Sequence, residues 1–235
     1  SIFISKYFPN YNIIKLLTNG MLYKTLLITK DKDNTPLIVK IFSKDNYDEK
    51  DKILFTEEYQ KMANIQKEIF NKKINNICPI ISMEDNGKVG MIFRQYIEYN
   101  LKERIYLMPY LKNIEKIWIA FQILYALNDL KKLKIIHGDL KPENILLTSN
   151  LSVYISDFVC YKPAYISIDD ITDYTYYFGS NRTDSMKGCY LAPERLLKKS
   201  SSSYINEKTF AMDIFSVGVI IAELFLERNI FDYTS

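Results

Sequence analysis

The stretch 137–144 holds the residues whose types and spacing most directly imply chemistry. It reads His-Gly-Asp-Leu-Lys-Pro-Glu-Asn, so a lysine follows Asp139 by two positions and an asparagine follows it by five. Transfer of a phosphoryl group from a nucleotide requires a carboxylate to accept the hydroxyl proton, a lysine to meet the phosphate and an amide oxygen to hold Mg²⁺. A polar loop after a helix is the alternative, but chance rarely produces this string. We expect Asp139 and Lys141 to be catalytic and Asn144 to bind the metal.

Asp157 is the second candidate metal ligand. It begins the triplet Asp-Phe-Val and follows Asn144 by 13 positions, close enough for the chain to return to the same cleft. A Mg²⁺–triphosphate site requires a second anionic ligand. An Asp-Phe pair alone carries little information, but after the motif at 137–144 it indicates a metal site.

Lys40 is a charge inside the apolar run 37–42. It is either a solvated residue of an edge strand or a phosphate-binding lysine that a carboxylate on the following helix orients. Glu57 and Glu58 are the candidates for that carboxylate. We favour Glu58, because Met62 and Ile65 would then pack behind it at helical spacing.

Two further motifs are interpreted as structural. Residues 192–195 read Ala-Pro-Glu-Arg, and residues 213–218 read Asp-Ile-Phe-Ser-Val-Gly. We expect the carboxylates of Glu194 and Asp213 to anchor, from below, the segment that follows Asp157 and the loop that holds Asp139.

The elements that must position these residues change character near residue 97. Apolar runs separated by turn residues predict a five-stranded antiparallel sheet, with one helix before the fourth strand. The strands are expected at 11–17, 21–29, 37–42, 79–83 and 89–96, and the helix at 55–70.

After residue 99 the pattern is mostly helical. Helix 113–133 should bury an apolar face formed by Ile114, Ile117, Trp118, Phe121, Leu124, Tyr125 and Leu127. Short strands are expected at 145–147 and 153–156, irregular structure at 159–192 and a strongly apolar helix at 209–226. This order predicts an α+β architecture of two lobes with a cleft between them.

Composition excludes several other classes of protein. The 235 residues carry a net charge of +3, which is too balanced to indicate a protein that binds nucleic acid. One histidine and three scattered cysteines argue against multi-histidine metal sites and disulfide frameworks. No apolar run is long enough to span a membrane. The first residue is not methionine, and we expect the sequence to be part of a longer protein.

Together the motifs resemble those of the eukaryotic protein kinases. Lys40, Asp139, Asp157, residues 192–194 and residues 213–218 follow in the order typical of that family. More narrowly, the chain is similar to the vacuolar protein-sorting kinases that are regulatory subunits of class III phosphatidylinositol 3-kinase complexes. The stretches that carry this similarity are 91–96, 113–124, 137–139, 156–158 with 162–163, 189–195, 211–216 and 221–225.

The resemblance implies a bilobal kinase fold, with an N-lobe at 1–97 and a C-lobe at 98–235 that ends after its αF-type helix. It implies transfer of the γ-phosphate of ATP or GTP, with Mg²⁺, to a protein serine or threonine, since Lys141 is typical of Ser/Thr kinases. It also implies a cytoplasmic protein that partners the lipid kinase's catalytic subunit and is held peripherally on endosomal and autophagic membranes by a lipid anchor outside this sequence.

The same resemblance implies residues for the nucleotide. Gly20 lies in the loop over the phosphates, and Gln95, Tyr96 and Ile97 form the hinge beside Arg94 at the gatekeeper position. An arginine has only donors, so it suits the O6 acceptor of guanine better than the N6 donor of adenine. Alternatively, Arg94 bends away to Glu58 or solvent.

Three departures from the family pattern leave two functions open. The phosphate loop has one glycine, Gly138 replaces an arginine, and Val159 replaces a glycine. Without a cation at position 138, we do not expect switching by loop phosphorylation. The chain is therefore either a Ser/Thr protein kinase or a nucleotide-binding scaffold that regulates a lipid kinase with little turnover. A small-molecule kinase is a weaker alternative, because the motifs at 192–195 and 213–218 argue against it.

Overall fold

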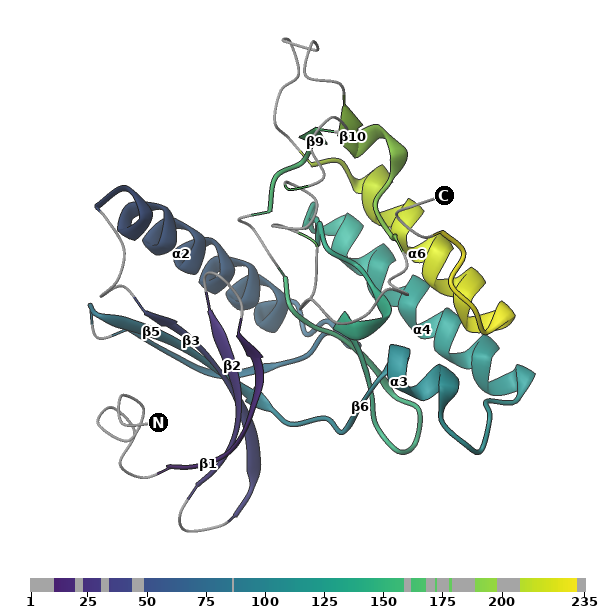
Figure 1. Cartoon of the computed structure of the whole chain (residues 1–235), viewed down its shortest axis with the longest axis horizontal. Coiled ribbons are helices and arrows are strands. Elements are labelled where there is room, and N and C mark those ends of the chain that lie inside the picture. Colours follow the sequence, from purple (N-terminus) through teal and green to yellow (C-terminus); the bar gives the residue numbers. More distant parts are fainter. Residues whose placement is uncertain are drawn as a thin grey trace. The chain divides into compact units, whose positions relative to one another are not determined.

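The structure of the chain is a computed structural model. It describes residues 11–19, 23–30, 34–43, 49–85, 87–158, 162–167, 172, 178, 189–197 and 208–231. The chain divides into two compact units (Figure 1). The first comprises Ser1–Lys73 and Cys78–Ile97, and the second comprises Ile74–Ile77 and Glu98–Ser235. The short segment Ile74–Ile77 thus belongs to the second unit although it precedes the last two strands of the first.

The first unit is a five-stranded antiparallel sheet with one helix, α2 (Glu49–Asn71), as the sequence predicted. The strand order is β1-β2-β3-β5-β4. The strands are β1 (Tyr11–Asn19), β2 (Lys24–Lys30), β3 (Pro36–Ser43), β4 (Ile80–Asp85) and β5 (Val89–Gln95). Helix α2 begins at Glu49, earlier than expected. Its first turns contain Glu and Lys, which favour helix, but they show no apolar periodicity, so the pattern did not reveal them.

The two faces of this sheet are buried differently, because side chains alternate along each strand. One face forms a cluster of buried apolar residues: Leu26, Ile28, Val39, Ile41, Val89, Met91 and Phe93. On the other face Phe42 and Ile92 pack with Tyr59 of α2. The Tyr59 hydroxyl donates to the carbonyl of Glu84 at 3.0 Å, which ties the helix to β4.

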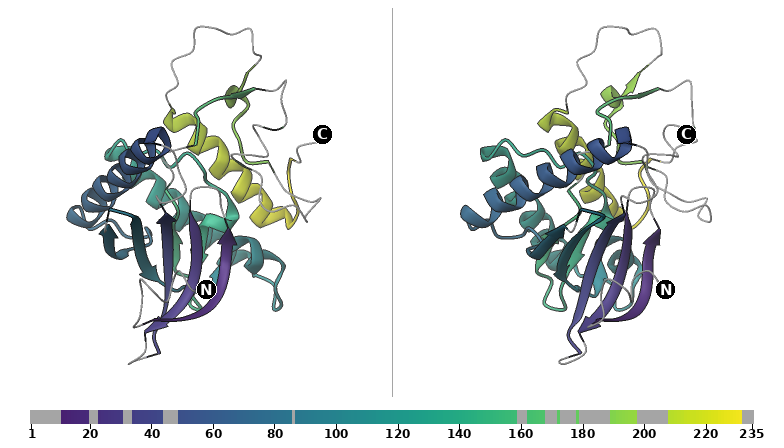
Figure 2. Two further views of the ribbon diagram at one scale, coloured as in Figure 1. Left: turned by 60° about the vertical axis from the view of Figure 1, so that its left-hand side comes forward. Right: turned by 90° about the vertical axis from the view of Figure 1, so that its left-hand side faces the viewer.

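The second unit is built on two helices, α4 (Asn113–Lys132) and α6 (Phe210–Leu226), which run side by side in all three views (Figure 1 and Figure 2). Shorter elements join them: α3 (Leu101–Tyr106), the 3-10 turns η1 (Pro142–Asn144) and η2 (Pro193–Arg195), and a small sheet of β6 (Tyr99–Asn100), β7 (Ile145–Leu147) and β8 (Val153–Ile155). The hairpin β7–β8 follows the loop that holds Asp139, and its register pairs Ile145 with Ile155.

Helix α4 buries a different face from the one expected. The described side chains that it buries are Lys116, Ile119, Ala120, Gln122, Ile123, Ala126, Leu127 and Leu130. Of the predicted face only Leu127 is buried, while Ile114, Ile117, Trp118, Phe121, Leu124 and Tyr125 are exposed. The helix is apolar on nearly every side, so its periodicity does not distinguish the face that packs inside the unit.

Part of the range expected to be irregular is paired. β9 (Ile166–Ser167) forms a parallel ladder with β10 (Leu196–Leu197). Two-residue strands leave no periodic signal in a sequence, so pattern analysis does not find them. Among the helices that the structure describes, none is long and apolar enough to cross a membrane.

Candidate active site

The loop that holds Asp139 is anchored by one buried carboxylate of α6, as the motif at 213–218 predicted. The backbone N–H of His137 donates to Asp213 Oδ2 at 2.7 Å, and that of Gly138 donates to Asp213 Oδ1 at 2.9 Å. Asp213 is only 1% exposed. Both of its oxygens are therefore used to hold main-chain donors that would otherwise be unsatisfied.

His137 and Gly138 give this loop its shape. The His137 ring is fully buried, accepts the Asp139 backbone N–H on Nδ1 at 3.2 Å and donates from Nε2 to the Ser156 carbonyl at 2.8 Å. Burial lowers the pKa of His137 although Asp213 opposes this effect, so the ring is neutral. Gly138 has a φ of +77°, and a Cβ there would come within 2.8 Å of Lys208 Cδ. Any other residue at 138 would be strained.

Three donors converge on a single oxygen of Asp139. Lys162 Nζ lies 2.7 Å from Asp139 Oδ2, and Lys141 Nζ lies 3.4 Å from it. Asn144 Nδ2 donates to the same oxygen at 3.4 Å and to the Asp139 carbonyl at 2.8 Å. Asp139 Oδ1 carries no hydrogen bond from any residue of the described ranges, which leaves it open to an incoming donor.

The charges of these groups set their protonation. Burial alone would raise the pKa of Asp139, but Lys141 and Lys162 outweigh it and hold that pKa below its ordinary value. Asp139 raises the pKa of Lys141 against the effect of burial. Burial lowers the pKa of Lys162 to about 8, although Asp139 opposes the shift. At neutral pH all three groups are therefore charged.

Asn144 and Asp157 are brought to neighbouring positions. The Ser156 backbone N–H donates to the Asn144 carbonyl at 2.8 Å, so the residue before Asp157 is bonded to Asn144. The Asn144 side chain is buried, and its amide nitrogen points at Asp139, which leaves its oxygen available. Asp157 has a φ of +67° and also contributes to the raised pKa of Lys141. An amide oxygen and a carboxylate are the hard ligands that Mg²⁺ takes.

No group of three or more His, Cys, Asp or Glu residues capable of holding a metal occurs in the described part of the chain.

Two cations of this site were missed by the sequence analysis as functional residues. Besides Lys162, Arg195 is 2% exposed and donates from Nη1 to the Gly138 carbonyl, from Nε to Ala164 and from Nη2 to Pro163, at 2.8–3.0 Å. The Phe178 ring lies 4.6 Å from Lys162 Nζ and 4.9 Å from Arg195 Cζ. Their signal in the sequence was weak: single charges beside Pro163 and in the run 192–195.

Glu194 does not act as expected within the described residues. It is exposed, and no described residue forms a hydrogen bond or ion pair with it. Arg195, the next residue, makes the anchoring contacts instead, because a guanidinium offers enough donors to satisfy several carbonyls at once.

In the first unit, Lys40 is not the edge-strand residue that the alternative required. β3 is the middle strand, Lys40 is 8% exposed, and its Nζ lies 4.5 Å from the centre of the Tyr23 ring. Lys40 pairs with Ile92 and Ile38 pairs with Arg94, so Lys40 and Arg94 share one face of the sheet. This is the face on which Ile92 packs with Tyr59 of α2.

The other predicted nucleotide residues of this unit are placed less fully. Arg94 Nη1 donates to the Gln95 carbonyl at 3.2 Å, while its Nε is buried without a partner. Gln95 is exposed, and Ile97 is half-buried at the end of the unit. Glu58 lies on α2, but its side chain is outside the description, as are Gly20 and Val159.

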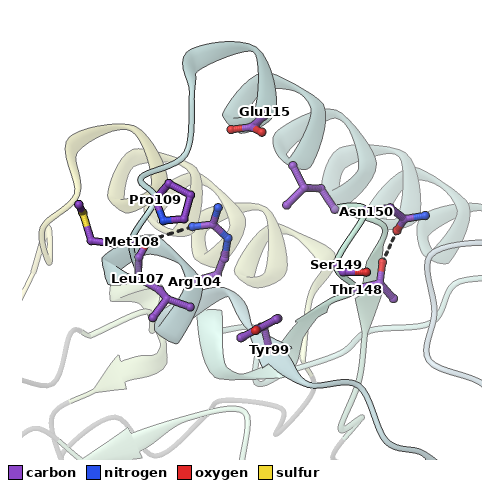
Figure 3. A pocket seen from close by; sticks show the side chains of 10 residues that line it. Tyr99, Arg104, Leu107, Met108, Pro109, Glu115, Thr148, Ser149 and Asn150 are labelled. Atoms are coloured by element: carbon purple, nitrogen blue, oxygen red, sulfur yellow. Dashed lines mark hydrogen bonds between the residues drawn. The ribbon is translucent and has the colours of Figure 1, made fainter.

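A pocket of about 490 Å³ lies elsewhere in the second unit (Figure 3). It shares no residue with the Asp139 cluster. Its lining combines the end of α3, the start of α4 and the β7–β8 turn: Tyr99, Arg104, Leu107, Met108, Pro109, Glu115, Thr148, Ser149, Asn150 and Leu151.

Comparison with known proteins agrees with this fold. The model of the protein kinase domain matches residues 11–235, and the chain belongs to the protein kinase family. It is similar to the kinases named VPS15. A probable serine/threonine-protein kinase vps15 of Dictyostelium discoideum is 39% identical over 94% of this chain, and the VPS15 kinase of Arabidopsis thaliana is 33% identical over 93%. That of Saccharomyces cerevisiae is 42% identical over 63%.

These relatives are much longer proteins. The matched region spans 11%, 14% and 10% of their respective lengths. A mitogen-activated protein kinase 15 of Xenopus laevis is more distant, at 28% identity over 78% of this chain.

Proposed function

We propose that this chain is the catalytic domain of a serine/threonine protein kinase, with the lobes 1–97 and 98–235. The observation that carries the proposal is the Asp139 carboxylate, whose Oδ2 is fixed by Lys141 and Asn144 of its own loop while Oδ1 is open. A carboxylate held in this way suits the positioning of an acceptor hydroxyl.

We assign the following roles to the residues of the site. Asp139 Oδ1 accepts the proton of the attacking serine or threonine hydroxyl, and Lys141 meets the phosphate that is transferred. Asn144 and Asp157 hold Mg²⁺, which neutralises and orients the triphosphate when bound. On the resemblance to the family, we propose that Lys40 binds the phosphates with Glu58 as its partner, that Gly20 belongs to the loop over the phosphates, and that Gln95 and Ile97 border the base.

We further propose that the nucleotide site accepts GTP at least as well as ATP. The buried Arg94 Nε without a partner supports this, because guanine O6 can accept from it, whereas the adenine amine cannot. Competition binding tests the proposal: Arg94→Met should weaken GTP about fivefold to tenfold, the scale of one hydrogen bond, and leave ATP unchanged. A preference for ATP of about tenfold that Arg94→Met does not alter would overturn it.

The names of the relatives support a wider context. We propose that the whole protein is the regulatory subunit of a class III phosphatidylinositol 3-kinase complex, held on endosomal and autophagic membranes by a lipid anchor outside this sequence. Copurification of that lipid kinase's catalytic subunit with the tagged full-length protein tests this context.

A scaffold with little turnover is the second candidate. The observation that favours it is the Lys162 ammonium on Asp139, which adds a third donor to the candidate base. Single-turnover transfer of the γ-phosphate by the full-length protein decides between the two functions. Transfer by the wild type that Asp139→Asn loses supports the kinase, whereas equal, background transfer by both supports the scaffold.

A further inference from the structure

Lys162 and Arg195 both connect the segment between Asp157 and Arg195 to the Asp139 loop. Lys162 reaches the Asp139 carboxylate, and Arg195 reaches the Gly138 carbonyl. Arg195 also donates to Pro163 and Ala164, next to Lys162 in sequence. The two side chains therefore act on adjacent residues of the loop, and we name them the 162/195 clamp.

The clamp is enclosed. Lys162 and Arg195 are 7% and 2% exposed, and the Phe178 ring lies against both cations. A cation between a carboxylate and an aromatic face is held from both sides, since each attracts it electrostatically. The position of the Lys162 ammonium is thus fixed by its own segment, by Asp139 and by Phe178.

These contacts place the cations on the opposite segment from a link that depends on phosphorylation. In such a link the loop next to the base supplies the cation, and the segment after Asp157 must acquire a phosphate. Here Gly138 supplies only its carbonyl, and the cations stand on the other segment. The acceptors, a carboxylate and a backbone carbonyl, are always present.

We propose that the 162/195 clamp holds the Asp139 loop in its working geometry without phosphorylation, and that Lys162 is the positioning residue for the Asp139 carboxylate. This inference rests on the proposed kinase function. Lys162 bonds Oδ2 only, so the open Oδ1 remains for the acceptor hydroxyl. A lysine that blocked the acceptor would have to occupy Oδ1 as well.

The chain offers a matched control. Lys116 forms an ion pair with Glu227, and its side chain is 7% exposed, as is that of Lys162. It lies on α4 and forms no hydrogen bond or ion pair with the Asp139 cluster. Lys116→Met therefore removes an equally buried charge from the same unit without touching the clamp.

The experiment compares Lys162→Met, Lys162→Arg and Lys116→Met in the full-length protein. Lys162→Met should lower kcat at least about tenfold and change nucleotide affinity less than about twofold, since misplacing a base affects the transfer step. Lys162→Arg should retain most of kcat, and Lys116→Met should leave it unchanged. Unchanged or increased kcat in Lys162→Met would overturn the proposal.

A second measurement does not depend on activity. Amide hydrogen exchange at 137–144 should be at least about tenfold faster in Lys162→Met, but not in Lys116→Met or in phosphatase-treated wild type. If phosphatase treatment loosens the loop, the clamp is not independent of phosphate and the proposal fails. If the wild type transfers no phosphate, the kinase function fails, while hydrogen exchange still decides on the clamp.

If Lys162→Met does not fold, Phe178→Leu takes its place. This change removes the aromatic face behind Lys162, and it should accelerate exchange at 137–144 in the same direction by a smaller factor. No acceleration of exchange in folded Phe178→Leu, together with an unchanged kcat in the same variant, would overturn the proposal.

Discussion

Asp213, at the start of α6, and Asp139, in the loop that Asp213 holds, are two carboxylates of the second unit with opposite roles. Asp213 is almost completely buried, and each of its oxygens accepts one backbone N–H. Asp139 receives three donors on Oδ2 and none from the described residues on Oδ1. Both oxygens of Asp213 therefore hold the loop, whereas Asp139 keeps one oxygen for chemistry.

The largest expected effect separates the two carboxylates by function. Asp139→Ala should lower phosphate transfer at least about a hundredfold, the scale of losing a positioned general base. Nucleotide affinity, measured by calorimetry, should change little, because Asp139 faces the acceptor. Wild-type transfer by purified Asp139→Ala would show that the activity comes from another protein.

Asp157→Ala extends the comparison to the metal. Mg²⁺-dependent nucleotide binding should be lost, because the neutral amide of Asn144 cannot by itself offset the charge of a triphosphate. Titration with and without Mg²⁺ measures this, and Asn150→Ala in the nearby β7–β8 turn is the control. Unchanged affinity in Asp157→Ala would remove it from the metal site.

Asp213→Ala should act on stability rather than on chemistry. It leaves the N–H groups of His137 and Gly138 buried without acceptors, at a cost of roughly 2–4 kcal/mol for the pair. Urea denaturation measures the loss, with Asp129→Ala as the control, since the Asp129 side chain is half-buried and pairs with the exposed Lys132. A loss no larger than that of the control would show that water or other acceptors replace the carboxylate.

The pH dependence of stability is the smallest effect. Lys162 has a pKa of about 8 when folded against an ordinary 10.5, so between these values the unfolded chain binds more protons. The free energy of unfolding should therefore rise with pH, by about 2 kcal/mol from pH 8 to 10. The rise should end near pH 10. Above that pH Tyr59 and Tyr106, whose pKa values are raised to about 12, keep their protons longer in the folded chain than in the unfolded one, which lowers the free energy of unfolding.

The difference between wild type and Lys162→Met isolates this contribution. Denaturation at pH 8, 9 and 10 should show the rise in the wild type and its absence in the variant. Parallel pH profiles of the two proteins would mean that the Lys162 ammonium is not desolvated in the folded state.

The sequence predicted the five strands of the first unit, the three long helices and the grouping of residues in the 137–144 loop, because the patterns that mark these features are local. Asp139, Lys141 and Asn144 lie within six residues of one another, and their spacing alone implies their meeting. Lys162 and Arg195 gain their positions only when distant segments return to the loop, which no local pattern encodes. The prediction of the buried face of α4 was wrong for another reason. A helix that is apolar on most sides has no periodicity to identify its packed face.

The exposed side of α4 also has a spectroscopic consequence. Trp118 is the one tryptophan of the chain, is 50% exposed and stacks on Phe121 with ring centres 5.6 Å apart. Its fluorescence therefore reports on a surface, where unfolding changes the surroundings of the indole less than it would in a core. The same probe is well placed to detect whatever covers this side of the helix, since burial of the indole would shift its emission to shorter wavelength.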